Sequence, residues 1–401
     1  MAINKISMKS INRKKVFETL WQYGECTQSD ISKLTNLTVA SVGKIINEFE
    51  KKKLVCRSGY VVSNGGRKPI KYDVDKSYYY ILGVSIGVGK IIFVISDLGG
   101  EISYQETQLF ELNENPEIVL ADIAHKLIEI INKNQISNDQ LLGIGVSAPG
   151  PLDSMKGIVL NPPNLITWQN ISVTRFLSDY FSQNIYLEKD ANCMALSELF
   201  YGPAKNVSNL LYLMVDSGIG SGIVINGQIY RGTSQVAGEI GHATIDINGP
   251  KCNCGNYGCL EAVASGNAMI EKALIEIKND SISILTAFED NLTLNDILYG
   301  FLQSDALCSQ LLFDSSRYAG IKLADKINFL NPELVVIGGT VPNKVHEYVT
   351  WVKDVAFKRI FQETAKSVRV RSSTFGEISE ALGAATLVVS NIFQAKQLKD
   401  N

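Results

Sequence analysis

The chain has 401 residues, of which 45% are hydrophobic and 20% charged, as expected for a globular protein of two or three domains. No apolar run approaches the roughly 20 residues of a membrane-spanning helix, and the first ten residues, MAINKISMKS, lack the apolar core of a secretion signal. Four of the seven cysteines are scattered, which argues against a secreted disulfide framework. We therefore expect a cytoplasmic protein without a membrane partner.

The net charge of −3 conceals an uneven distribution along the chain. Residues 1–76 contain 15 Lys and Arg against 7 Asp and Glu, whereas the remaining residues contain 23 basic and 34 acidic side chains. A basic N-terminal segment on an acidic body indicates that the segment meets a polyanion while the body does something else. A merely solvated basic surface is the alternative.

The first 35 residues indicate two helices. An apolar-periodic stretch begins near Asn12 and ends at a glycine, which predicts the first helix. Thr27 followed three residues later by Asp30 resembles a capping box, with Asp in place of the usual Glu, and predicts the start of a second helix. We expect Ile31 and Leu34 to face the core.

A third helix is predicted from about Thr38 to Lys51. Its apolar residues recur at i, i+3, i+4 and i+7 and define one buried stripe: Val42, Ile45, Ile46 and Phe49. This leaves small or hydrogen-bonding side chains toward solvent, the kind of face that a recognition helix presents to the DNA major groove. The predicted DNA-binding residues of this face are Thr38, Ser41, Lys44 and Asn47.

The following stretch alternates like a short β-hairpin around Asn64-Gly65-Gly66. Beside the glycines, Arg67 and Lys68 are placed to enter a narrow minor groove. The order helix, helix, polar-faced helix and basic hairpin resembles the winged helix-turn-helix of bacterial repressors. A three-helix domain that binds protein is the alternative. We assign residues 1–56 to a winged helix-turn-helix DNA-binding domain and 57–76 to its wing and a linker.

From Tyr78 onward, strands and helices alternate, and one pattern occurs twice. YYYILGVSIGVGKIIFVISDLGG and, from position 210, LLYLMVDSGIGSGIVINGQIY each place an apolar strand before a glycine turn and a second apolar strand. This internal echo predicts an α/β body of two related halves. It is similar to the actin, hexokinase and Hsp70 class, the ribonuclease-H-like ATPase fold. We expect α/β domains at 77–194 and 195–377, with a C-terminal helix at 378–398 packing back on the first.

Three cysteines lie close together in CNCGNYGC, and one of the chain's three histidines lies ten residues before the first of them. Three thiolates and an imidazole form the ligand set of a closed structural zinc site. The predicted zinc ligands are His242, Cys252, Cys254 and Cys259. Gly255 and Gly258 would supply the tight turns between them. A thioredoxin-type pair needs C-x-x-C, which this cluster lacks, but redox chemistry or chance stay open as alternatives.

The cluster and the residues before it, GTSQVAGEIGHATIDINGPKCNCGNYGCLE, resemble the signature of the ROK family, named for repressor, open reading frame and kinase. Further family-like stretches are SAPGPLD at 147–153, PPNL at 162–165, DANCMALSE at 190–198 and IGG at 337–339. With the winged head in front, the chain resembles the repressor branch, particularly its xylose-repressor-like members.

This resemblance implies a sugar pocket in the cleft between the two α/β domains. Its predicted sugar-binding residues are Asn164, Asp190, Glu239, His242 and Glu261. His242 would bind zinc through one ring nitrogen and face the sugar with the other. Glu239 and Glu261 have an alternative role as supports of the zinc loop. Asp190 corresponds to the general base of the family kinases, and Lys189 stands where the family usually has Asn.

The phosphate-binding turns separate two hypotheses, a sugar-responsive repressor and an ATP-dependent sugar kinase. Family kinases begin with Asp-x-Gly-Gly-Thr, whose Asp helps to hold Mg²⁺, but this chain has Ser85-Ile86-Gly87-Val88-Gly89. The second turn, Gly-Thr-Gly in kinases, is Asp216-Ser217-Gly218, with a carboxylate where phosphate should approach. We therefore predict no enzyme and no catalytic residues.

The predicted protein is a repressor of carbohydrate-utilisation genes that contains structural Zn²⁺ and responds to a small-molecule sugar. Xylose is suggested by the branch that the chain resembles. Its DNA partner would be a pseudo-palindromic double-stranded operator, because paired half-sites mirror a two-fold dimer. We expect a homodimer or homotetramer.

Overall fold

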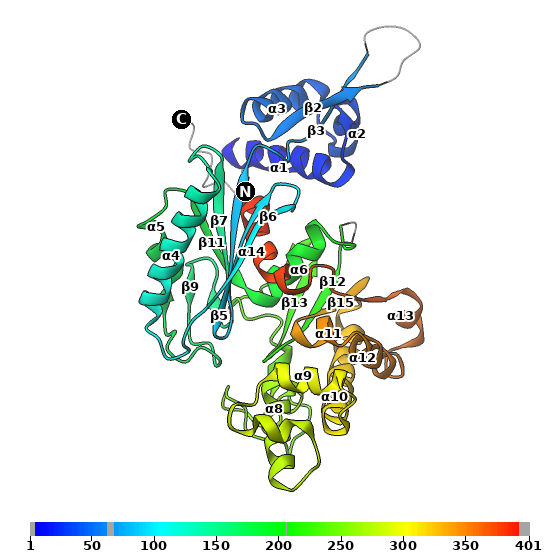
Figure 1. Ribbon diagram of the computed structural model, residues 1–401. Coiled ribbons are helices and arrows are strands. Elements are labelled where there is room, and N and C mark those ends of the chain that lie inside the picture. Colours follow the sequence, from blue (N-terminus) through cyan, green and yellow to red (C-terminus); the bar gives the residue numbers. More distant parts are fainter. Residues whose placement is uncertain (1–4, 62–67, 206, 393–401) are drawn as a thin grey trace.

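The structure, a computed structural model, describes residues 5–61, 68–205 and 207–392, which form a small N-terminal head on a larger body (Figure 1). In the described part of the head lie α1 (Lys5–Tyr23), β1 (Cys26–Thr27), α2 (Gln28–Thr35), α3 (Val39–Lys51), β2 (Val55–Tyr60) and β3 (Ile70–Val74). The three strands pair as an antiparallel sheet with β3 in the middle. The predicted turn 64–66 and Arg67 lie outside the described residues.

The capping pattern at the start of α2 is confirmed. The Thr27 side chain accepts a hydrogen bond from the Asp30 backbone N–H, and the Asp30 carboxylate accepts one from the Thr27 backbone N–H. The core-facing position predicted at Leu34 is wrong, because that side chain is 48% exposed. Thr35 is buried instead and donates its hydroxyl hydrogen bond to the carbonyl of Ile31.

Helix α1 begins at Lys5, well before the predicted start near Asn12. Its first half carries no apolar stripe, so hydrophobic periodicity could not reveal it. A polar contact joins the end of this half to α3. Arg13 is buried and donates from Nε to the Glu48 carboxylate on α3 over 3.0 Å.

The body contains two five-stranded sheets with the same connectivity. In spatial order, the first sheet is β11 (Asn184–Lys189), β7 (Leu141–Ala148), β4 (Tyr80–Ile86), β5 (Lys90–Asp97) and β6 (Ile102–Leu109). The second is β16 (Arg369–Ser372), β15 (Leu334–Gly338), β12 (Leu210–Val215), β13 (Ile219–Ile225) and β14 (Gln228–Ile229). In each sheet, the first three strands in chain order pair antiparallel with one another. The last two strands in chain order extend the sheet on the other side of the first strand and pair in parallel. The predicted duplication and fold class are confirmed.

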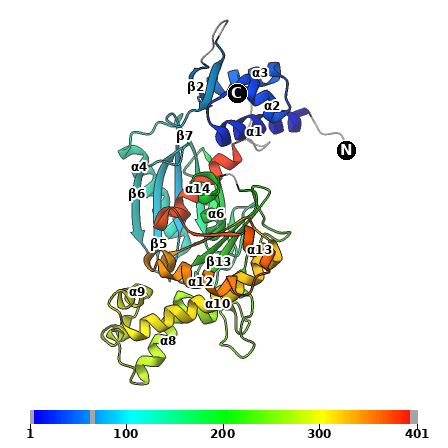
Figure 2. The same cartoon turned by 90° about the vertical axis from the view of Figure 1, so that its right-hand side faces the viewer.

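Two helices pack between the sheets: α6 (Asp190–Phe200) and α14 (Ser379–Asn391) (Figures 1 and 2). Glycines allow the close approach. A Cβ on Gly145 of β7 would collide with the backbone of Ala384 on α14, and a Cβ on Gly222 of β13 would collide with the backbone of Ala191 on α6. The two halves of the body therefore meet on a tightly packed helical layer.

The remaining elements connect the strands of the two sheets. Along the first sheet they are β8 (Leu152–Asp153), β9 (Ile158–Val159), β10 (Ile171–Ser172), α4 (Pro116–Lys133) and α5 (Val173–Ser178). The rest belong to the second half: α7 (Leu260–Ala264), α8 (Gly266–Lys278), α9 (Leu294–Leu302), α10 (Ala306–Leu330), α11 (Thr340–Lys344), α12 (Glu347–Phe357), α13 (Gln362–Ser367) and the 3₁₀ turns Ile240–His242, Ile284–Asn291 and Gly376–Ile378. Helices α8 and α9 lie at the end of the body opposite the head (Figure 2). Within the described ranges, no helix is long and apolar enough to cross a membrane.

The head and the body share one hydrophobic core. Apolar side chains of all three head helices pack in the same buried cluster as Ala385, Val388 and Val389 of α14. The Trp21 ring meets the edge of Phe200 at the end of α6, with 5.7 Å between ring centroids. The two helices that lie between the sheets therefore also contact the head.

Candidate functional site

A cleft of about 350 Å³ lies between the two halves of the body. Its walls come from both halves, including the β4–β5 turn of the first sheet and the β12–β13 turn of the second. The five residues predicted to bind sugar all line it: Asn164, Asp190, Glu239, His242 and Glu261. The fold thus gathers side chains that are spread over about a hundred residues of sequence into one cavity of the size of a small-ligand site.

The predicted metal ligands also come together at the edge of this cleft. One ligand atom from each of His242, Cys252, Cys254 and Cys259 lies within 4.8 Å of the others. His242 Nδ1 is 3.6 Å from Cys252 Sγ, and Cys254 Sγ is 3.7 Å from Cys259 Sγ. Ligands at roughly 2.1–2.3 Å from one tetrahedral ion are about 3.5–3.8 Å apart, so these two separations match a zinc site, and the 4.8 Å limit on the whole set leaves only small adjustments.

Two glycines shape the backbone that carries the thiols. Gly255 and Gly258 have φ angles of 93° and 61°, in the left-handed region that other residues rarely adopt. A side chain on Gly258 would also collide with the carbonyl of Asp246. The predicted need for glycine at both positions is confirmed.

The cysteine cluster is connected directly to the cleft. Cys259 immediately precedes α7, and Glu261 lies in the first turn of that helix. The Glu261 Oε2 atom accepts a hydrogen bond from the Ile219 backbone N–H over 2.9 Å, and burial raises the pKa of this carboxyl group. A Cβ on Gly218 would lie 2.6 Å from Glu261 Oε2, so the glycine turn makes room for the carboxylate.

Lys189 has a larger part in the cleft than the sequence indicated. Its side chain is buried, and its ammonium group donates hydrogen bonds to Glu239 Oε1 and to the Ala237 carbonyl, each over 2.9 Å. The lysine stem packs against Gly150, since a Cβ there would lie 3.0 Å from Lys189 Cδ. The sequence revealed the unusual residue, but the partner fifty positions away could not be inferred from it.

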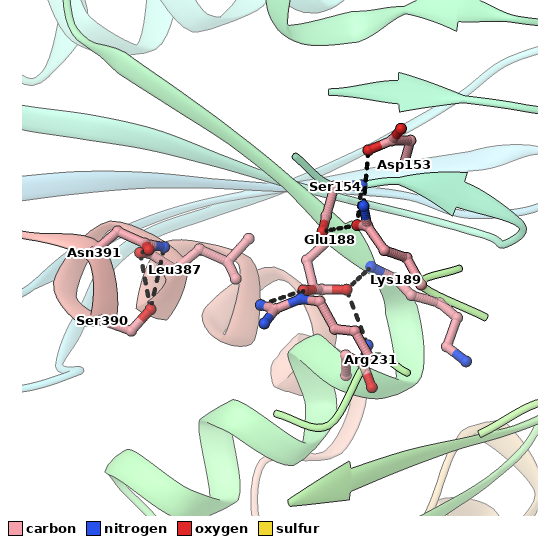
Figure 3. Close-up of polar contacts among 10 residues, drawn as sticks. Asp153, Ser154, Glu188, Lys189, Arg231, Leu387, Ser390 and Asn391 are labelled. Carbon is pink, nitrogen blue, oxygen red and sulfur yellow. Dashed lines mark hydrogen bonds and ion pairs between the residues drawn. The ribbon is translucent and has the colours of Figure 1, made fainter. Parts of the chain in front are cut away.

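Glu188, the neighbour of Lys189, points the other way, toward Arg231 (Figure 3). It is 2% exposed, and its Oε2 atom accepts from Arg231 Nε and Nη2 over 2.6 Å each. Its Oε1 atom accepts from the Lys189 backbone N–H and from Asn192 Nδ2, both over 2.9 Å. Segment 231–239 is therefore fastened to the first half of the body at both ends, by Arg231 and by Glu239.

Asp190 begins helix α6 and faces the cleft. Burial, followed by the nearby Glu380 carboxylate, raises the pKa of Asp190 to about 8, and the Lys189 ammonium opposes this shift. Burial also raises the pKa of Glu380, which accepts a short hydrogen bond from Ser147. Glu380 was missed at the sequence level, since an acidic residue in the first turn of a helix is ordinary.

In the half of the cleft formed by the glycine turns, Asp216 is occupied by the protein itself. Its Oδ2 atom accepts from the Thr340 backbone N–H over 2.9 Å and from the Thr340 hydroxyl. Its Oδ1 atom accepts from the Ser217 backbone N–H over 2.7 Å. The carboxylate thus uses donors of the β12–β13 turn and of the first residue of α11, and it adds negative charge there.

The residues predicted to contact DNA lie on the head. Thr38, Ser41, Lys44, Asn47 and Lys68 are all exposed, whereas Arg67 lies outside the described residues. Thr38 is engaged as the cap of α3, because its side chain accepts from the Ser41 backbone N–H over 3.2 Å. Lys44 and Asn47 are one helical turn apart on the same face.

A duplicated α/β body with a polar cleft, a Cys₃His cluster beside it and a three-helix head with a β-hairpin define an actin- and hexokinase-like protein with an appended winged helix. Residues 81–391 match the ROK family, and the chain belongs to this family.

The repressors and the kinases of this family differ in how much of this chain they match. The chain is 30% identical to the xylose repressor of Caldicellulosiruptor bescii over 391 residues, which cover 97% of this chain and 98% of the relative. The crystal structure of a ROK family transcriptional regulator, a homologue of E. coli Mlc, covers 98% of both chains with a TM-score of 0.83 and 26% identity. The ROK hexokinase of Thermus thermophilus is 28% identical with a TM-score of 0.63, and covers 78% of this chain but 99% of its own. Part of this chain therefore has no counterpart in that kinase.

Proposed function

We propose that this protein is a sugar-responsive transcriptional repressor of carbohydrate-utilisation genes. Its head binds a pseudo-palindromic operator, and a sugar in the cleft changes the affinity for that operator. The observation that carries the proposal is the shared core of head and body. Because α6 and α14 contact both the sheets that form the cleft and the head, a change in the cleft can alter the position of the head.

The relatives support this function over that of a kinase. The Caldicellulosiruptor bescii protein is named a xylose repressor, and it is matched over nearly its full length, head included. The Thermus hexokinase instead leaves part of this chain unmatched. Xylose is therefore the first sugar to test. The proposed division of labour follows the predicted domains, with residues 1–76 for DNA and the α/β parts 77–194 and 195–377 for the sugar.

We propose that the Cys₃His cluster holds structural zinc. Closed sites with four protein ligands leave no open position for catalysis, and here the clamp lies next to two cleft residues, His242 and Glu261. Zinc would fix the orientation of His242 through Nδ1 and leave its Nε2 atom for the cleft. The metal thus supports the sugar pocket.

We propose that the cleft does not transfer phosphate. Ser85 stands in place of the acidic residue that holds Mg²⁺ in the family kinases, and the carboxylate of Asp216 opposes an incoming phosphate. Glu377 and Glu380 add further acidic groups to the same half of the cleft. These charges agree with a regulator that binds a ligand without turning it over.

The central test measures binding of the protein to a fluorescent operator fragment, with and without D-xylose, by anisotropy. A sugar that binds the two positions of the head unequally shifts the operator dissociation constant, typically by about 5- to 150-fold. Size-exclusion chromatography with light scattering tests the proposed homodimer or homotetramer on the same sample. An operator affinity that no sugar in a panel of pentoses and hexoses changes would contradict the proposal.

The head is tested through the salt dependence of operator binding. Replacing Lys68 with Ala removes one phosphate contact, so the slope of log K against log salt concentration decreases by about 0.9. Replacing Asn47 with Ala removes a base contact and weakens the cognate operator by about 1–3 kcal/mol relative to a scrambled duplex. Lys358, exposed on the far half of the body, serves as the matched control for Lys68. A salt slope for the Lys68 variant that is unchanged, as it should be for the Lys358 control, would argue against a wing in the groove.

A further inference from the structure

The ion pair between Lys189 and Glu239 is the feature of the cleft that the proposed function leaves unexplained. A lysine in a sugar pocket has two opposite uses: it can bind a phosphate or carboxylate of the ligand, or it can hold a protein carboxylate in place. The two uses predict different ligands. The contacts of Lys189 decide between them.

The ammonium group is already committed to the protein. Of its three N–H donors, one goes to Glu239 Oε1 and one to the Ala237 carbonyl, and the side chain is 7% exposed. The positive charge is therefore neutralised by a carboxylate at contact distance before any ligand arrives. The Glu239 carboxylate, in contrast, keeps its Oε2 atom available, and it is about a third exposed in the cleft.

The cleft has more acidic than basic side chains, although Asp190, with its pKa raised to about 8, is mainly uncharged near neutral pH. Six acidic side chains line it, against three lysines: Asp190, Asp216, Glu239, Glu261, Glu377 and Glu380, with Lys90, Lys189 and Lys344. Since Lys189 is paired, few cationic groups are left for an anionic substituent on the ligand. Carboxylates and the Asn164 amide are instead suited to a set of neutral hydroxyl groups, each of which donates and accepts hydrogen bonds.

We propose that Lys189 is a positioning and specificity-determining residue, which holds Glu239 as an acceptor for sugar hydroxyls and makes the cleft select uncharged sugars over sugar phosphates and sugar acids. This inference rests on the proposed sugar response and names its ligand class. Lys189 acts through Glu239 and not by contact with an anionic group of the ligand. It also ties segment 231–239 to the first half of the body, through the Ala237 carbonyl.

The wild-type protein is tested first, by isothermal titration calorimetry with matched pairs of ligands. The pairs are D-xylose and D-xylonate, D-glucose and glucose 6-phosphate, and N-acetylglucosamine and its 6-phosphate. For whichever sugar binds, the neutral member is expected to bind at least about 100-fold more tightly than its charged partner, because the anion would lie unpaired among carboxylates. Tighter binding of the charged partner overturns the proposal.

The variant Lys189→Met keeps the stem that packs on Gly150 and removes the charge. Affinity for the neutral sugar is expected to fall about tenfold or more, because Glu239 loses its partner and its fixed orientation. The fold-loss of sugar affinity in the double variant Lys189→Met/Glu239→Gln is expected to be smaller than the product of the losses in the two single variants. The reason is that each single change already removes the same ion pair. Lys156→Met is the control, because Lys156 also pairs with a carboxylate, that of Asp153, but is 73% exposed and does not line the cleft.

The ratio of affinities for the neutral and charged ligands separates a specific role from a structural one. Loss of the Lys189 charge leaves the cleft more negative, so binding of the charged partner weakens further, whereas a general loss of packing weakens both ligands alike. If Lys189→Met does not fold, Lys189→Gln supplies a neutral donor to Glu239 and is expected to retain most of the affinity for the neutral sugar. Tighter binding of the charged ligand by either variant would contradict the proposal.

The outcomes distinguish this inference from the proposed function. If wild-type protein binds operator but no ligand of the panel, the sugar response and this inference both fail. If neutral sugar binds and changes operator affinity equally in wild type and Lys189→Met, only the role of Lys189 fails.

Discussion

The two halves of the cleft contain similar numbers of carboxylates and use them differently. On the side of the cysteine cluster, Glu239 is held by Lys189 and Glu261 by the Ile219 backbone, and both carboxylates line the cavity. On the side of the glycine turns, Asp216 is satisfied by Thr340 and Ser217, and Glu380 by Ser147. Among the hydrogen bonds of the described residues, Glu239 and Glu261 each accept from the protein through one oxygen, which leaves the other for a ligand, whereas both oxygens of Asp216 accept from protein donors.

The largest expected effect comes from disrupting the proposed zinc site beside Glu239 and Glu261. Cys254→Ser removes one thiolate from an exposed position, so little packing is lost, but the tetrahedral site is incomplete. We expect zinc content, measured by plasma mass spectrometry, to fall from about one ion per chain toward zero, with loss of the sugar response. Cys56→Ser, at an exposed cysteine of the head, is the control. Full sugar response in a zinc-free variant would disprove the proposed support of the sugar pocket by zinc.

The contrast between the halves is tested directly by two isosteric changes. Glu261→Gln removes a charged acceptor from the side of the cysteine cluster, and the sugar dissociation constant is expected to rise about 10- to 100-fold, equal to about 1.4–2.7 kcal/mol. Asp216→Asn alters the glycine-turn half, so the sugar affinity stays within about twofold, while loss of charged hydrogen bonds lowers the free energy of unfolding by about 1–2 kcal/mol. Calorimetric titration and urea unfolding of both variants measure these effects. Equal losses of sugar affinity in the two variants would mean that the two sides of the cleft contribute alike to sugar binding.

Phosphoryl transfer is the next test of the glycine-turn half. Incubation of the protein with ATP, Mg²⁺ and a panel of sugars is expected to yield no sugar phosphate above the background. The same result is expected for Asp216→Asn, because position 85 is Ser in both proteins and offers no carboxylate for Mg²⁺. A coupled assay for ADP measures this. Turnover at the roughly 1–100 s⁻¹ of ordinary kinases would overturn the proposed regulator.

Local patterns allowed much of this architecture to be predicted. The Thr27–Asp30 cap and the four cysteine and histidine positions lie within short stretches that fix their own geometry. The two hairpins around the glycine turns predicted the duplicated fold, because strands and turns are also local. The ROK resemblance then supplied distant residues such as Asn164, which composition and spacing alone could not have connected with the zinc loop.

The contacts that sequence could not supply are those between distant positions. Lys189 and Glu239 are fifty residues apart, and Glu380 reaches the cleft only because the last helix returns between the two sheets. Leu34 fits an apolar helical spacing, yet Thr35 is the residue that turns inward. Each case depends on where a segment docks, which periodicity along one helix does not determine.

The last expected effect concerns the stability of the fold instead of ligand binding, and it depends on Asp190. Its pKa is raised to about 8, mainly by burial and then by the Glu380 carboxylate, and the Lys189 ammonium opposes this shift. The folded protein therefore binds a proton between about pH 4 and 8 that the unfolded chain releases, so this group lowers stability as pH rises through that window. We expect Asp190→Asn to raise the melting temperature relative to wild type at pH 9, and to have little effect at pH 4. Thermal unfolding at both values measures the difference. A gain that is the same at both pH values would show that the carboxyl group is not desolvated in the cleft, and that the cleft is more open to water than its contacts indicate.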